Sequence, residues 1–269
     1  AGEPRPSTCV MAPQRCHPSQ EASSPHPHIL HLVADDLGVH DVGYRNPQMQ
    51  TPNLDSLRTC GVALDSFYSF KACGPSRASI LTGRYPFHLG IYSNEDVTNG
   101  VPTNFTFLPQ ILSSKGYATH AVGKWHLGFR TEQATPTRRG FDSFFGFWHC
   151  CSDYFKHTFP DDGFLDLVNA TREGGVHPAR GHDGEYSAFL FSQVASRIIR
   201  QHPLSQSLYL YLAFQSTHGP LQVPDHYRRM QEAAHPEWDR GKQVYAGMVT
   251  AMDSAIGRVL QTLRGVKLW

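Results

Sequence analysis

The chain lacks long hydrophobic runs, a surplus of charge of one sign, and any Cys-x-x-C pair. Its longest apolar stretches, such as Leu208 to Phe214, are far shorter than the roughly 18 residues of a membrane-spanning helix. The formal net charge is only +1, so bulk charge gives no reason to expect binding to nucleic acid or to a membrane surface. We therefore expect no nucleic-acid partner and no membrane span, and function must reside in a local site.

The cysteines also lack the spacing of a zinc site. They are Cys9, Cys16, Cys60, Cys73, Cys150 and Cys151. The adjacent pair Cys150-Cys151 does not define a disulfide framework, so cysteine usage leaves the redox compartment open.

A chain of 269 residues with 40% apolar residues can bury one large core. Residues 1–27 are rich in proline, serine and glutamine and show almost no apolar periodicity, which predicts a mobile extension. Residues 28–269 are expected to form one folded domain. The chain begins with Ala1 and no signal peptide opens it, so we expect that its start was processed away or is missing.

Apolar periodicity predicts alternating strands and helices. Strands are expected at 28–34, 62–68, 118–122 and 208–214, and helices at 51–57, 73–84, 108–115, 185–200 and 240–263. Residues 130–185 give no clear element. This alternation predicts an α/β fold with a largely parallel sheet, in which ligands bind at the carboxyl ends of the strands.

Polar residues follow three of these strands directly. Asp35 and Asp36 end the first, and they are either a polar turn or a pair of oxygen ligands for a divalent cation. Lys124 and His126 follow the third and, being two residues apart, can face one pocket; packing and solvation would also account for them. His218 follows the last strand.

Cys73 opens the stretch around which the chain is organised, Cys73-Gly74-Pro75-Ser76-Arg77. Pro75 suits a first helical turn, and the helix N-terminus and Arg77 favour an anion beside the cysteine. A lone cysteine would more often be a buried structural residue. Because four groups of this kind sit at strand ends or a helix start, a joint functional interpretation outweighs four coincidences.

The pattern Cys73-x-Pro75-x-Arg77 with Leu81-Thr82-Gly83-Arg84 resembles the signature of the sulfatase family. Further segments resemble the eukaryotic arylsulfatases of the family over nearly all of residues 28–269. They are residues 33–38, 51–55, 122–128, 136–142 and 218–224, and the last two look most like the arylsulfatase B (N-acetylgalactosamine-4-sulfatase) group and its close relatives.

This resemblance implies an alkaline-phosphatase-like fold and the hydrolysis of sulfate esters, of small aryl molecules or of sulfated glycans such as glycosaminoglycans. It implies one Ca²⁺ ion held by Asp35, Asp36 and Cys73. It also implies that a formylglycine-generating enzyme converts Cys73 to formylglycine, the nucleophile.

The resemblance further implies roles for four residues. Arg77 would stabilise the hydrated aldehyde, and His126 would help to deprotonate it. Lys124 and His218 would bind the sulfate oxygens, and His218 would protonate the leaving alcohol.

The sequence departs from the family pattern in two respects. Gly74 stands where many members have Thr, Ser or Cys. The chain also stops at Trp269, before the Asp-Asn pair that completes the family's calcium site, a later Lys and the smaller C-terminal domain. We therefore expect an incomplete catalytic domain with weak calcium affinity and poor activity.

Two other functions stay open. One is a truncated, inactive product that acts as a binding or regulatory protein. The other is a cysteine hydrolase that pairs Cys73 with His218, although it would not explain the two aspartates.

Two N-glycosylation triplets begin at Asn104 and Asn169. Such triplets also occur by chance, but they are compatible with a secretory route. We expect a glycoprotein of the secretory pathway, lysosomal or extracellular.

Overall fold

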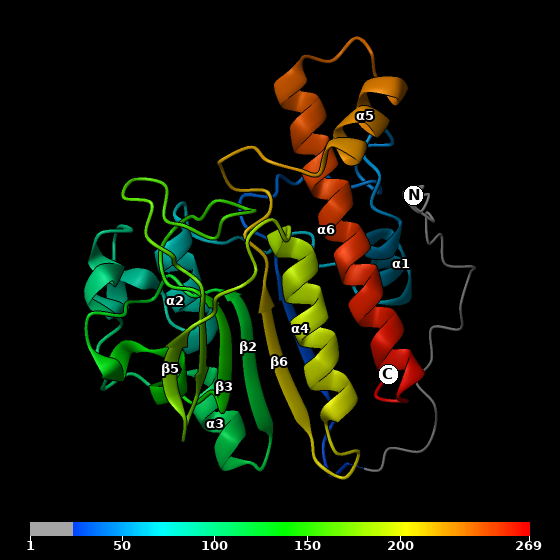
Figure 1. The fold of residues 1–269 in the computed structure, drawn as a ribbon. Coiled ribbons are helices and arrows are strands. Elements are labelled where there is room, and N and C mark those ends of the chain that lie inside the picture. The colour runs from blue at the N-terminus through cyan, green and yellow to red at the C-terminus, as the bar shows by residue number, and fades with distance from the viewer. Residues whose placement is uncertain (1–23) are drawn as a thin grey trace.

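A six-stranded sheet runs through the computed structural model of the protein, which describes residues 24–269 (Figure 1). The strand order is β1-β6-β2-β3-β4-β5. The pairs among β1, β6, β2 and β3 are parallel, and β3-β4 and β4-β5 are antiparallel. The predicted α/β fold with a largely parallel sheet is therefore confirmed.

The strands are β1 (Ile29–Val33), β2 (Ala118–Lys124), β3 (Ser143–Phe147), β4 (Val168–Thr171), β5 (Gly175–Pro178) and β6 (Leu208–Ala213). The helices are α1 (Pro52–Cys60), α2 (Cys73–Thr82), α3 (Leu108–Ser114), α4 (Ser187–Gln201), α5 (Asp225–Ala234) and α6 (Arg240–Gly265). Short 3-10 turns lie at Pro86–Leu89, Asp96–Asn99, Glu132–Ala134 and Pro136–Arg138.

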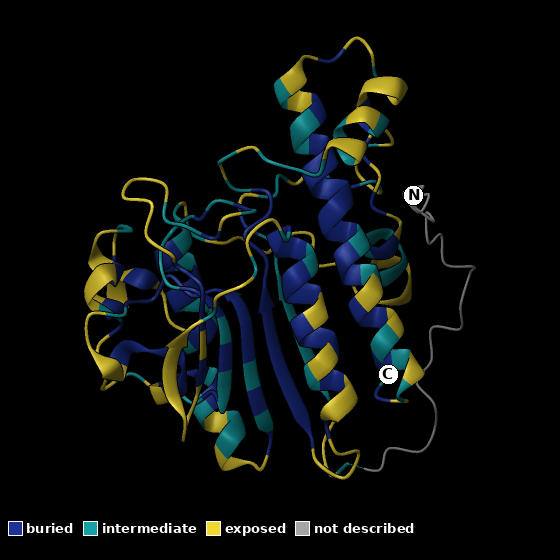
Figure 2. Ribbon diagram, in the orientation of Figure 1, coloured by how far each residue is buried: buried dark blue, intermediate teal, exposed yellow. Residues whose placement is uncertain are grey.

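Strand β6 lies at the centre of the parallel part and is buried along its whole length (Figure 2). Alternate side chains of a strand point to opposite faces of the sheet. Leu210 and Leu212 accordingly join the core under α4 and α6, while Tyr209 and Tyr211 join the core on the other face. A strand buried on both faces needs apolar residues at every position, which explains its continuous apolar run.

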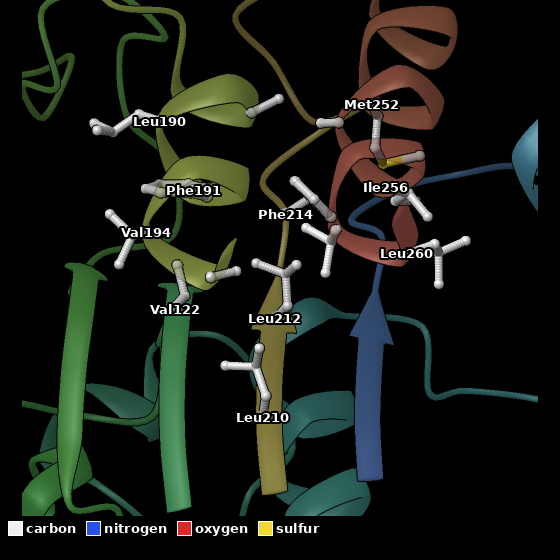
Figure 3. Packing of buried hydrophobic residues seen from close by; sticks show 14 of the residues in the cluster. Val122, Leu190, Phe191, Val194, Leu210, Leu212, Phe214, Met252, Ile256 and Leu260 are labelled. Carbon is white, nitrogen blue, oxygen red and sulfur yellow. The ribbon is translucent and has the colours of Figure 1, made fainter. Parts of the chain in front are cut away.

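Helices α4 and α6 lie side by side over one face of the sheet (Figure 1). Met252, Ile256 and Leu260 of α6 pack toward Leu212 of β6 and Phe214, the residue that follows this strand (Figure 3). Met252 is fully buried and Ile256 is 2% exposed, so the apolar stripe of this helix is covered within the chain. Its helical spacing of apolar residues is the pattern expected of an amphipathic helix on a sheet.

Helix α2 packs against the opposite face of the sheet. Its Ala78 and Leu81 are completely buried in the same core as Tyr211. This contact fixes the start of α2, and with it Cys73, relative to the carboxyl ends of the strands.

Two glycines, in β2 and β3, stand where a side chain would collide with the backbone of the neighbouring strand. A Cβ on Gly123 would come 1.9 Å from the carbonyl oxygen of Ala213, and a Cβ on Gly146 would come 1.9 Å from the carbonyl oxygen of Gly123. Gly123 also has a φ of 103°, which L-residues with side chains rarely adopt. The two glycines therefore set the position of Lys124, which ends β2.

Residues 24–27 contact the body of the fold, although they belong to the predicted extension. The amide of His26 donates to Ser207 Oγ at 3.1 Å, and the Tyr117 hydroxyl donates to the carbonyl of Pro27 at 2.9 Å. Residues 1–23, which make up the rest of that predicted extension, lie outside the described residues.

The predicted strand at 62–68 is wrong. The segment is irregular, and Val62, Leu64, Phe67 and Tyr68 are 70–90% exposed. Its apolar, β-branched composition favours a strand, but a strand needs a hydrogen-bonded neighbour, and none of the described strands pairs with these residues. Conversely, β3, β4 and β5 lie in the region that gave no clear element.

Helix α1 is capped by a residue that is distant in sequence. The Asp253 carboxylate on α6 accepts hydrogen bonds from the amides of Asn53 and Leu54, at 3.2 and 2.9 Å, and from Asn53 Nδ2 at 2.8 Å. Free amides at a helix N-terminus need acceptors, and an anion also interacts favourably with the helix dipole. Gly257, whose Cβ would come within 2.7 Å of the Asn53 side chain, lets the two helices approach.

This cap predicts a pH-dependent stability. Burial raises the pKa of Asp253 to about 6, and the hydrogen bonds it accepts oppose only part of that shift. Because the folded-state pKa lies above the unfolded value of about 4, the proton-linked contribution to stability is complete below pH 4 and is lost as the pH rises through 6.

We expect the unfolding free energy of the wild type, relative to Asp253→Asn, to fall by about 2–3 kcal/mol between pH 4 and pH 7.5. The asparagine keeps an acceptor but does not titrate. Urea unfolding of both proteins across this range is the measurement, and parallel pH profiles would contradict the prediction.

Candidate active site

Asp35 lies at the carboxyl end of β1 and is 4% exposed. The backbone pairing of β1 with β6 continues beyond both strands, because the Asp35 amide donates to the carbonyl of Ser216 at 2.8 Å. Burial alone would raise the pKa of the Asp35 carboxyl, but the positive charges of Arg77 and Lys124 outweigh it and hold the pKa below its usual value. Asp35 is therefore a buried carboxylate.

Two cations neutralise this carboxylate. Lys124 Nζ donates to Asp35 Oδ2 at 2.5 Å, and the Arg77 guanidinium lies 3.3 Å from Asp35 Oδ1. Both cations are almost completely buried, and Arg77 also donates to the carbonyl of Lys124 at 3.1 Å. Two buried cations against one carboxylate leave a positive charge, which makes this a site that favours an anion.

Cys73 is the first residue of α2, so its sulfur lies at the helix N-terminus. Its Sγ is 3.2 Å from His126 Nδ1. Burial, helped by the charges of Lys124 and Arg77, lowers the pKa of His126 to about 3, so the imidazole is neutral near pH 7. A neutral imidazole beside a side chain at position 73 can accept a proton from it.

Asn94 also belongs to the site, and the sequence analysis missed it. Its side-chain oxygen accepts the Gly74 amide at 3.0 Å and the Cys73 thiol at 3.4 Å. It therefore occupies part of the N-terminus of α2 and orients the sulfur. Asn94 lies 21 residues after Cys73 in a stretch without a recognisable motif, so no local signal pointed to it.

Asp36 and His218 lie at the rim of the site. Asp36 has a φ of 57°, which turns its carboxylate away from the buried Asp35, and 62% of its side chain is exposed. His218 Nε2 lies 3.7 Å from Asp36 Oδ2. The single hydroxyl proton of the buried Tyr154 is shared between the carbonyl oxygens of His218, at 2.7 Å, and Gln215, at 3.0 Å, which fixes the segment that carries His218.

The structure thus brings Asp35, Arg77, Lys124, Cys73 and His126 together and places Asp36 and His218 beside them. Among the described residues, the histidine that lies within hydrogen-bond distance of the Cys73 sulfur is His126. His218 does not make this contact, which a cysteine hydrolase that pairs Cys73 with His218 would require.

The described residues do not by themselves form a calcium site. Ca²⁺ takes about six to eight oxygen ligands. Both oxygens of Asp35 are engaged by Lys124 and Arg77, and Asp36 faces outward. Within residues 24–269, no group of three or more His, Cys, Asp or Glu side chains could hold a metal ion.

The two glycosylation triplets are separate from this site. Asn104 and Asn169 are both exposed, and Asn169 lies in β4, opposite Phe145 of β3.

In the part of the chain that the structure describes, none of the helices has the length and hydrophobicity needed to cross a bilayer.

A protein-family model described as "Sulfatase" matches residues 27–268 of the chain. The chain is 35% identical over 253 residues to mouse arylsulfatase J, covering 90% of this chain and 40% of that protein. It is 32% identical over 253 residues to human N-acetylgalactosamine-6-sulfatase, and this match covers 88% of this chain and 47% of that protein. The chain spans about half the length of the curated relatives it matches.

Solved structures share the fold. The crystal structure of Ps i-CgsB in complex with k-i-k-neocarrahexaose is 30% identical with a TM-score of 0.74, covering 90% of this chain and 56% of that one. The phosphonate monoester hydrolase of Agrobacterium radiobacter is 17% identical with a TM-score of 0.62, and the match covers 91% of this chain and 60% of the hydrolase chain. At this identity the likeness is one of fold alone.

The buried charge cluster predicts a specific stability pattern. Asp35→Asn should lower the unfolding free energy by about 3–5 kcal/mol, because it leaves Lys124 and Arg77 buried without a counter-charge. The double variant Asp35→Asn/Lys124→Met should recover part of that loss, because only one cation remains.

Urea unfolding monitored by circular dichroism measures these values. Asp65→Asn is the matched control, because it breaks the exposed Arg45–Asp65 pair and should change stability little. A double variant no more stable than Asp35→Asn would show that charge repulsion is not the cause.

Proposed function

The chain belongs to the sulfatase family, and on that premise we propose that the protein containing it hydrolyses sulfate esters of small aryl molecules or of glycans. The observation that carries this proposal is the buried cluster in which Lys124 and Arg77 outnumber Asp35, next to Cys73 at a helix N-terminus. Fixed positive charge and helix amides stabilise an anionic sulfuryl group as charge develops in the transition state.

We propose that Cys73 is the precursor of formylglycine. Pro75 and Arg77, which accompany it in the family signature, are both in place, and Cys73 is a free, partly exposed thiol. A formylglycine at position 73 would supply, as its hydrate, one hydroxyl to attack sulfur and a second through which sulfate is expelled.

His126 is the proton acceptor at this position. Its Nδ1 lies 3.2 Å from the Cys73 sulfur, and the low pKa keeps the imidazole unprotonated until it receives a proton. Arg77 holds Asp35 on one side and the carbonyl of Lys124 on the other, so it keeps the start of α2 against β1 and β2.

Lys124 and His218 act on the sulfate and the leaving group in this proposal. Lys124 provides a buried positive charge whose ammonium is fixed by Asp35. The side chain of His218 is 25% exposed and lies at the rim, 3.7 Å from Asp36 Oδ2, where an ester oxygen can meet its ring. It is the candidate to protonate the departing alcohol.

Calcium binding is proposed for the whole protein only. Asp35, Asp36 and the modified Cys73 would supply part of the oxygen shell, and the remaining ligands would have to come from outside residues 24–269. We derive no catalytic step from this ion.

The two exposed triplets at Asn104 and Asn169 support a secretory route, because the secretory pathway is where asparagines in such triplets receive N-glycans. We propose a lysosomal or extracellular glycoprotein that meets the formylglycine-generating enzyme on the way.

The modification of Cys73 can be observed directly. We expect that protein made in a modification-competent secretory host carries an aldehyde at position 73, so that the peptide loses its alkylatable thiol and reacts with an aminooxy probe. Peptide mass spectrometry is the measurement, and Cys73→Ser is the unreactive control. An intact thiol at Cys73 in such material would refute the proposal.

The role of Lys124 gives a kinetic prediction. In the whole protein, Lys124→Met should lower turnover of an aryl sulfate by roughly two to three orders of magnitude, the usual effect of removing one charge-stabilising group. Lys115→Ala removes an exposed lysine nearby in sequence and should leave turnover unchanged.

Circular dichroism of each variant separates lost chemistry from lost fold. Near-normal turnover of Lys124→Met would show that the sulfate lies elsewhere. A folded whole protein that carries the aldehyde but turns over no sulfate ester would favour the alternative of a binding or regulatory protein.

A further inference from the structure

Two adjacent free thiols lie next to the proposed active site and take no part in its chemistry. Cys150 and Cys151 follow β3 and are both partly exposed. Their sulfur atoms are only 3.2 Å apart. Side chains of neighbouring residues commonly diverge, so this approach places two thiols within reach of a bond.

The pair lies beside the positive charges of the site. The parallel pairing of β2 and β3 continues past both strands, since the His126 amide donates to the carbonyl of Trp148 at 3.1 Å. Cys150 comes two residues after Trp148, at the same edge of the sheet. The Cys151 thiol, helped by the charges of Lys124 and His218, lowers the pKa of Cys150 to about 6 although burial opposes the shift.

The same hydrogen bond raises the pKa of Cys151. The two sulfurs share one hydrogen bond, in which either can be the donor, so the surrounding charges decide which thiol ionises first. Lys124 and His218 both act on Cys150, which we take as the attacking thiol, and Cys151 then keeps its proton until it reacts. This is the usual division between an attacking and a resolving thiol.

We propose that Cys150 and Cys151 form a reversible redox modification site, a dithiol that closes to a vicinal disulfide by exchange with a low-molecular-weight disulfide. In the first step the Cys150 thiolate attacks one sulfur of the small disulfide, forms a mixed disulfide and releases one small thiolate. Cys151 then loses its proton and attacks the Cys150 sulfur, which closes the Sγ–Sγ bond and releases the second thiolate.

The exchange is balanced. Two protein thiols are oxidised, one small disulfide is reduced, and the two released thiolates take up the two thiol protons. No other oxidant is required.

The geometry of adjacent residues makes this bond easy to reopen. Their Cα atoms are about 3.8 Å apart across a trans peptide, less than the roughly 4.4–6.8 Å of ordinary disulfides. Such a bond is strained, and strained, exposed disulfides are the labile ones. A millimolar dithiol reductant should therefore restore both thiols.

The test uses oxidised glutathione as the probe on the folded chain at pH 7. After acid quenching and alkylation, the peptide with Cys150 and Cys151 should lose both alkylation sites and weigh two hydrogens less than the dithiol. Dithiothreitol should restore both sites. Cys73→Ser should behave like the wild type, which excludes Cys73 as the partner.

The single variants identify the order of attack. Cys151→Ser should accumulate a stable glutathione adduct on Cys150, because no resolving thiol is present. Cys150→Ser should react at least tenfold more slowly, because the remaining thiol, without Cys150 beside it, returns toward the ordinary cysteine pKa and is mostly protonated at pH 7.

Three results would overturn the proposal. They are a stable glutathione adduct on the wild-type pair, two thiols that stay alkylatable at every glutathione concentration, and a disulfide from either cysteine to Cys73. The wild-type measurement decides among these even if a variant fails to fold, and none of them depends on sulfatase turnover.

Discussion

The buried carboxylate of Asp35 is the constraint on which the site depends. It is contacted by a lysine from the end of β2 and an arginine from the first turns of α2, so one anion ties together three elements from distant parts of the chain. A buried cation without a counter-ion is costly, and each of these cations needs Asp35. The three charges stabilise the fold only when all of them are present, and together they still leave one positive charge for an anionic ligand.

Local backbone geometry then separates residues that look equivalent in sequence. Asp36 and His126 both have positive φ angles, of 57° and 49°, which are unusual for residues with side chains. Such conformations persist when the surrounding contacts impose them, and they cluster at functional sites. Here they place Asp36 at the rim beside His218, and His126 against the Cys73 sulfur.

Much of the fold was predictable because its signals are local. The continuous apolar run of β6, the spacing along α6 and the polar residues at strand ends all report burial or sheet edges without knowledge of the rest of the chain. Residues 62–68 carry the same kind of signal, yet they form no strand, because strand formation needs a partner as well as propensity. Strands β4 and β5 are short, and β5 is fully exposed, so their periodicity is too weak to recognise.

The sequence by itself determined the family motif around Cys73, the parallel α/β architecture and the gathering of Asp35, Lys124, His126 and His218 at one edge of the sheet. Only the tertiary structure decided that Asp35 is buried while Asp36 is exposed, and that Asn94 holds the start of α2. It also decided that Asp253 caps α1 from 200 residues away, and that the positive charge of Lys124 acts on the Cys150 thiol. The physical reason is that charge, pKa and hydrogen bonding depend on distances between side chains. Those distances are fixed by packing between elements that periodicity and motif spacing describe one at a time.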